Sequence, residues 1–168
     1  MIKKNNTWSI FPSGWVLCVS ILCFSLSCAG QKIPRDIIQY VNHDIMNISQ
    51  LETNALKSYA SVTGNNYTTD ERVHDALKNT VVPFYGRFAE LLREISPPTE
   101  ELRRIHSFYV SGAESMCNGF KLKMVGIEKN DENLIRMGNN QIVAGRDETL
   151  KWRTELGILL QKSAVKMK

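Results

Sequence analysis

Apolar residues recur every three or four positions along most of the chain, the spacing that places them on one side of an α-helix. Four stretches show this pattern, at residues 35–62, 68–95, 99–128 and 132–165. Short segments with glycine, asparagine or proline separate them. No stretch alternates apolar and polar residues as a half-buried strand does. The pattern therefore predicts an all-α fold, an up-down-up-down antiparallel four-helix bundle.

The second stretch contains signals for where its helix begins and bends. Thr68 and Glu71 have the spacing of a capping box, which predicts that the helix starts at Thr68. Pro83 has no N–H and its ring clashes with the carbonyl four residues back, so we expect a kink near residues 79–82. The apolar positions with helical spacing in this stretch are Val73, Leu77, Val81, Phe84, Phe88, Leu91 and Ile95.

Glycines recur at intervals of seven in the last two stretches. They are Gly112, Gly119 and Gly126 in the third stretch, and Gly138 and Gly145 in the fourth. Glycine inside a helix costs about 1 kcal/mol relative to alanine. Its repetition on one side of a helix therefore predicts that another backbone passes close by. We expect the third and fourth helices to form an antiparallel hairpin with a contact lined by glycine.

The first 27 residues have a different pattern. Lys3 and Lys4 precede the uncharged, mostly apolar run of residues 15–27, which is the order of a bacterial export signal. The run is shorter than the roughly 20 apolar residues that span a bilayer. We therefore expect a removed signal peptide and not a permanent membrane helix.

The residues around Cys28 resemble the lipobox of bacterial lipoproteins. Residues 24–28 read FSLSC, with a small residue before the cysteine, and Ser25 stands where the family prefers leucine. The resemblance implies that the chain is cut before Cys28 and that Cys28 carries fatty acyl groups that hold the protein on the membrane. Ala29 replaces the aspartate that retains members of the family in the inner membrane. In a Gram-negative cell this implies the outer membrane, facing the periplasm.

Ordinary export, with cleavage after Ser27 or Ala29, is the alternative, because residues 27–29 also have the small-x-small form. Two of the four cysteines lie in the signal, so the mature chain keeps Cys28 and Cys117. Acylation of Cys28 leaves Cys117 as a lone thiol, whereas without acylation the two cysteines could form a disulfide.

The sequence thus divides into a signal peptide (residues 1–27), a tether (28–34) and a helical bundle domain (35–168). Loss of the two lysines in the signal lowers the formal net charge from +4 to +2. This near-neutral balance, without a nucleic-acid-binding motif, argues against a nucleic-acid partner.

No catalytic motif, cofactor site or metal site is predicted. Glu71 and His74 form one Glu-x-x-His pair, whereas di-iron bundles use two such pairs and two further glutamates. Covalent haem needs a Cys-x-x-Cys-His motif, which is absent. We therefore expect a protein that acts by binding and not an enzyme.

Two sets of side chains are candidates for binding. Phe84, Tyr85 and Phe88 follow Pro83, and we expect them to form an aromatic interaction surface for a protein partner or a second copy of the chain. The second set is a candidate ligand site on the third helix, consisting of His106, Tyr109 and Cys117. It belongs to the alternative function, a periplasmic sensory bundle that binds a small ligand, a metal or haem. Haem would be ligated by a methionine (Met116, Met124 or Met137) together with His43 or His106.

Overall fold

A computed structural model describes residues 34–165, with side chains up to residue 163. This part of the chain forms four long helical segments and contains no strand. The first segment runs from Arg35 to Ala60 and the second from Asp70 to Glu94, followed by α5 (Glu100–Glu128) and α6 (Glu132–Val165). The all-α prediction is confirmed for these residues. The signal peptide and Cys28 lie outside them.

Each of the first two segments contains a stretch of π-helix, whose wider turn holds one more residue than an α-helical turn. The first segment consists of α1 (Arg35–Gln39), the π stretch η3 (Tyr40–Ile45) and α2 (Met46–Ala60). The second consists of α3 (Asp70–Ala76), the π stretch η5 (Leu77–Val81) and α4 (Val82–Glu94). The sequence predicted a distortion just before Pro83, and η5 lies at that place. No proline explains η3, which the sequence did not predict.

The second segment begins one residue later than the capping box predicted. Its N-cap is Thr69, whose hydroxyl accepts a hydrogen bond of 3.4 Å from the backbone N–H of Arg72. The choice of Thr68 as the cap was therefore wrong by one position. Glu71 still takes part, because its own backbone N–H and the Thr69 hydroxyl donate to its carboxylate and lower its pKa.

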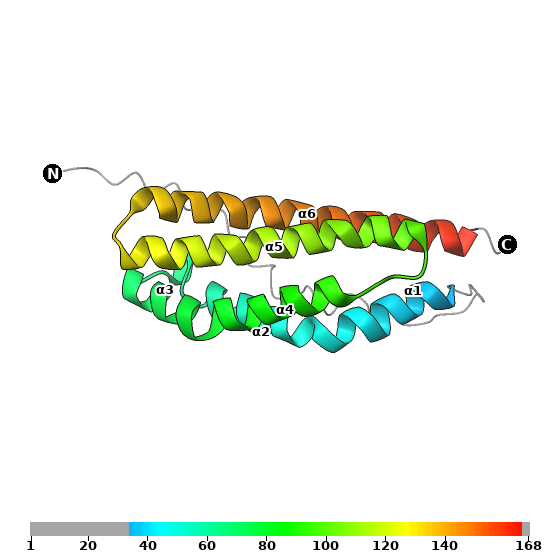
Figure 1. The fold of residues 1–168 in the computed structure, drawn as a ribbon, viewed down its shortest axis with the longest axis horizontal. Coiled ribbons are helices and arrows are strands. Elements are labelled where there is room, and N and C mark those ends of the chain that lie inside the picture. Colours follow the sequence, from blue (N-terminus) through cyan, green and yellow to red (C-terminus); the bar gives the residue numbers. More distant parts are fainter. Residues whose placement is uncertain (1–33, 166–168) are drawn as a thin grey trace.

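α5 and α6 lie side by side along most of their length (Figure 1), and the recurring glycines line their contact. A Cβ atom placed on Gly119 would lie 2.6 Å from the carbonyl oxygen of Gly138, and one on Gly145 would lie 2.5 Å from that of Gly112. These pairs run in opposite sequence order, so the two helices are antiparallel. The predicted hairpin is confirmed. We call its contact, formed by Gly112, Gly119, Gly126, Gly138 and Gly145, the glycine seam.

The first two segments pack together through α2 and α4, and α4 also packs on α5. The largest fully buried side chains come from these segments and from α5. They include Tyr40, Tyr85, Phe88, Phe120, Leu77 and Leu92. Among the described residues, no helix has the length and apolar character needed to cross a membrane.

Candidate functional site

Five polar and aromatic side chains meet inside the molecule and join three of its helical segments. They are Tyr40 of η3, Glu52 of α2, His106 and Tyr109 of α5, and Trp152 of α6, and we call them the Tyr–Trp cluster. Glu52 is half-buried and the other four are buried. A hydrogen bond from His106 to α4 adds the remaining segment.

The donor and the acceptor of each hydrogen bond around Tyr40 can be assigned from the groups involved. The Nε1–H of Trp152 donates to the hydroxyl oxygen of Tyr40 over 2.9 Å. His106 Nε2 lies 3.1 Å from the carbonyl oxygen of Leu92, which can only accept, so Nε2 carries the proton. Nδ1 of the neutral ring is then the acceptor, and the Tyr40 hydroxyl donates to it over 3.0 Å. Every polar atom in this chain of bonds has a partner.

Burial keeps these rings neutral. It lowers the pKa of His106, although the bond to the Leu92 carbonyl opposes the shift. It raises the pKa of Tyr40, against the hydrogen bond from Trp152. Removing water disfavours the charged form of each group. The neutral histidine that the hydrogen bonds require is therefore also the form that burial favours.

The other half of the cluster contains an acidic group. The hydroxyl of Tyr109 donates to Oε2 of Glu52 over 2.7 Å. The ring of Tyr109 stacks on Trp152, with 4.0 Å between ring centroids and 19° between planes. Burial raises the pKa of Glu52 to about 7, although the Tyr109 hydrogen bond and the charge of Arg153 lower it. Glu52 therefore changes its charge near neutral pH, where an ordinary glutamate is fully ionised.

A cleft of about 380 Å³ lies beside His106, between the end of α4 and the start of α5. Its arginines already have partners. Arg93 forms an ion pair of 2.8 Å with Glu114, and Arg103 one of 3.0 Å with Glu100. The cleft therefore offers a ligand no charged group that lacks a partner.

The structure brings together two of the three residues of the predicted ligand site. His106 and Tyr109 belong to the Tyr–Trp cluster. Cys117 lies eight residues further along α5, about 12 Å at the rise of an α-helix, and its Sγ faces Gly86. Burial raises the pKa of the Cys117 thiol, which keeps it in the less reactive protonated form. Cys117 forms no disulfide within the described part of the chain.

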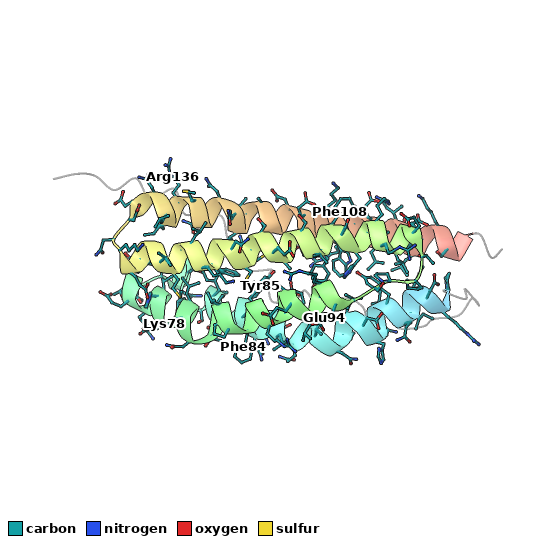
Figure 2. The ribbon with its side chains drawn as sticks, viewed as in Figure 1. Lys78, Phe84, Tyr85, Glu94, Phe108 and Arg136 are labelled. Carbon is teal, nitrogen blue, oxygen red and sulfur yellow. The ribbon has the colours of Figure 1, made fainter. Side chains whose placement is uncertain are left out.

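The predicted aromatic interaction surface is contradicted for two of its three residues. Tyr85 and Phe88 are fully buried, and of the three rings only Phe84 reaches solvent, with 37% of its surface exposed. The Tyr85 hydroxyl donates to the sulfur of Met116 over 3.2 Å, and its ring contacts Phe88 edge-on. Figure 2 shows Tyr85 directed into the bundle and Phe84 directed away from it.

Phe88 already belongs to the apolar positions with helical spacing, and the physical reason for the burial of Tyr85 in place of Phe84 lies in η5. Counted from Val73, which precedes η5, a uniform period of 3.6 residues would place Phe84 and Leu91 on the core-facing side, whereas the buried positions are Tyr85 and Leu92. A π turn holds one more residue than an α-helical turn. It therefore moves the core-facing side by one position for the rest of the segment.

The described residues contain no group of three or more histidine, cysteine, aspartate or glutamate side chains placed to hold a metal. His74 of the Glu-x-x-His pair instead contacts Glu128, over 2.9 Å. Both ring nitrogens of His106 take part in hydrogen bonds. His43 is exposed and lies against Asp44, with 3.1 Å between Nδ1 and Oδ1. The hydrogen bonds of His106 therefore use the nitrogen lone pair that a haem iron would need, whereas the contact of His43 involves only Nδ1.

Sequence reasoning missed Tyr40, Glu52 and the role of Trp152. Glu52 carried a usable signal, since a charged residue stands between Ile48 and Ala55 on the apolar side of the helix. A charge at such a position is rarely left without a partner. No comparable signal identified Tyr40, because its partners come from distant parts of the chain.

Comparison with known proteins gives no assignment: no family model, no curated protein and no solved structure matches the chain.

Proposed function

We propose that the chain is a lipid-anchored protein of a bacterial cell envelope and that its helical domain acts by binding a protein partner. The lipobox resemblance at residues 24–28 supports the anchor. In this proposal the domain is an up-down-up-down antiparallel bundle. The opposite directions of α5 and α6 and the short connections between segments support that arrangement.

The observation that carries the binding proposal is the set of exposed apolar side chains on the outward side of α6. The described residues include eight large apolar side chains that are exposed, and four of them, between 39% and 58% exposed, lie on this helix. Three of them and a glycine define what we call the α6 outer surface: Val143, Leu150, Gly157 and Ile158. Exposed apolar side chains gathered on one element are typical of interaction sites.

Gly157 adds a second argument. A Cβ atom on Gly157 would meet nothing within 4 Å, whereas one on each glycine of the seam would meet other atoms at 3.0 Å or less. Contacts within the molecule therefore give no reason for a residue that costs about 1 kcal/mol in a helix. Val143, Leu150 and Gly157 recur at intervals of seven, so a helix that packed along this line would approach closely at Gly157.

The tether restricts where such a partner would be. Six residue steps separate Cys28 from Pro34, which is about 20 Å of fully extended chain. Acyl groups on Cys28 would hold the domain within that distance of the membrane. The partner in this proposal is therefore another envelope protein.

The anchor is tested by the intact mass of the mature protein isolated from its native membrane, before and after reduction. A mass that includes acyl groups on Cys28 supports the proposal. A lipid-free mass that gains two hydrogens on reduction would mean a disulfide between Cys28 and Cys117. The anchor would then be rejected.

Binding is tested with a photo-crosslinking residue placed at Leu150 in living cells. The matched control carries the same residue at Phe84, which is also exposed but lies on α4. We expect a discrete cross-linked product from position 150 and none from position 84. The same yield from both positions, or none from position 150, would reject the α6 outer surface as the binding site.

A second candidate is the sensory bundle, and the half-buried carboxyl group of Glu52, which accepts from Tyr109 and whose pKa is raised by burial, favours it. The signal it would detect is a proton and not a metal or haem.

A further inference from the structure

Glu52 stands on the core-facing side of α2, one turn after Ile48 and three residues before Ala55. Three helical elements contribute titratable or charged groups around it. Tyr109 of α5 donates to its carboxylate over 2.7 Å, Arg153 of α6 attracts its charge, and Tyr85 of α4 lies close enough to be affected by that charge. The Glu52 carboxyl group thus forms a hydrogen bond with α5 and interacts electrostatically with groups of α4 and α6.

The surroundings of Glu52 stabilise its neutral carboxyl group more than its carboxylate. The neutral carboxyl matches the apolar surroundings and keeps its contact with Tyr109. The carboxylate loses most of its water, and one hydrogen bond with the attraction of Arg153 only partly replaces that loss. Because Glu52 is half-buried, protons can still exchange with solvent.

We infer that Glu52 makes the packing of the first helical segment against the α5–α6 pair sensitive to protons, because this half-buried position favours the folded domain more when the carboxyl group is protonated than when it is ionised. The Tyr109 ring that it holds stacks on Trp152, so ionisation acts on the contact with α6 as well as with α5. The inference does not depend on the lipid anchor. In the envelope protein proposed above it would be a response to the pH outside the cytoplasm, and this role rests on the proposed function.

The direction of the effect follows from the pKa of Glu52, which burial raises from 4.5 to about 7. Below 4.5 the folded and unfolded chains both hold the proton. As pH rises from 4.5 to 7, the unfolded chain loses the proton while the folded chain keeps it, so folding becomes less favourable. Above 7 both forms are ionised and this dependence ends.

His106 acts in the opposite direction over part of this range. Its lowered pKa means that the unfolded chain takes up a proton first as pH falls below 6.5, which reduces stability at acid pH. The contribution of Glu52 must therefore be read as the difference between the protein and a variant that lacks only that carboxyl group.

The experiment measures the melting temperature of the mature protein between pH 5 and pH 8, beside Glu52→Gln, which keeps the shape without the charge. The melting temperature of Glu52→Gln should exceed that of the unchanged protein by on the order of 5 to 10 °C at pH 8, and the difference should shrink towards pH 5. The control is Glu90→Gln, an exposed residue of α4 paired with Arg87 over 3.2 Å, which should follow the unchanged protein at every pH. A difference between Glu52→Gln and the unchanged protein that is the same at pH 5 and pH 8 would overturn the inference.

A direct titration covers the case in which Glu52→Gln fails to fold. In the unchanged protein labelled with ¹³C at glutamate carboxyl groups, one resonance should titrate near pH 7, well above the others. A set of glutamate resonances that all titrate below pH 5 would overturn the inference, whatever the variant does.

Discussion

α6 is attached to α5 at the glycine seam and to the first helical segment through the Tyr–Trp cluster, and the two contacts depend on opposite properties. At the seam the backbones touch because side chains are absent, and a Cβ on Gly145 would lie 2.5 Å from a carbonyl oxygen. In the cluster the helices are joined by large side chains whose polar atoms are paired, as where Tyr40 accepts from Trp152 over 2.9 Å. The seam is therefore sensitive to added atoms and the cluster to removed ones.

The largest effect that we expect comes from removing one oxygen atom from the cluster. Tyr40→Phe leaves Nε1 of Trp152 without its acceptor and Nδ1 of His106 without its donor, both inside the protein. Leaving a buried polar group without a partner costs about 1 to 3 kcal/mol. We expect the free energy of unfolding to fall by about 2 to 4 kcal/mol in urea denaturation followed by circular dichroism.

The matched control is Tyr67→Phe. Tyr67 is exposed, and its hydroxyl donates to Asp70 over 3.1 Å at the surface. Water replaces that bond, so the change should stay within about 0.5 kcal/mol. Equal losses in the two variants would show that the bonds around Tyr40 contribute no more than surface bonds.

The next effect comes from adding one carbon atom to the seam. Gly119→Ala places a methyl group 2.6 Å from the carbonyl oxygen of Gly138 and 2.8 Å from Ile142. The helices must move apart, and this cost outweighs the gain of about 1 kcal/mol in helix propensity. We expect a net loss of about 1 to 3 kcal/mol in the same measurement.

Gly86→Ala is the control for the seam. A Cβ there meets only the sulfur of Cys117, at 3.9 Å, which is an ordinary contact. The substitution should be neutral or stabilising by up to about 1 kcal/mol. If Gly119→Ala also stabilised the protein, the close approach of α5 and α6 would have to be abandoned.

The difference between the glycine seam and the Tyr–Trp cluster also determined which of the two contacts the sequence could predict. The seam repeats along the chain, so its glycines could be read as one pattern, and the hairpin was predicted with its contact. The cluster has no such pattern, since 112 positions separate Trp152 from Tyr40. Of its members only Glu52 has a signal in the sequence, a charged residue on the apolar side of a helix, and that signal was not used.

The π stretch η5 explains the error at the predicted aromatic interaction surface. Helical periodicity correctly predicted the core-facing positions of the second segment up to Val81. After η5 the buried positions shift from Phe84 to Tyr85 and from Leu91 to Leu92. Pro83 predicted a distortion of the helix, but not that the distortion would be a π turn with one extra residue. An interaction surface that included Tyr85 was therefore assigned to a core position.

The smallest effect that we expect comes from Gly157 of α6, compared with Gly145 of the same helix, which lies in the glycine seam. Gly145→Ala should destabilise the isolated protein, because its Cβ meets the backbone of α5, whereas Gly157→Ala should stabilise it by about 0.5 to 1 kcal/mol, because its Cβ meets nothing. Thermal unfolding of the two variants compares one substitution at two positions of one helix. If a partner helix approaches Gly157 in the cell, the methyl group that stabilises the isolated protein should lower the cross-linking yield from position 150. A yield that stays unchanged would mean that no backbone comes close at Gly157, and the argument from its missing contacts would no longer support the α6 outer surface.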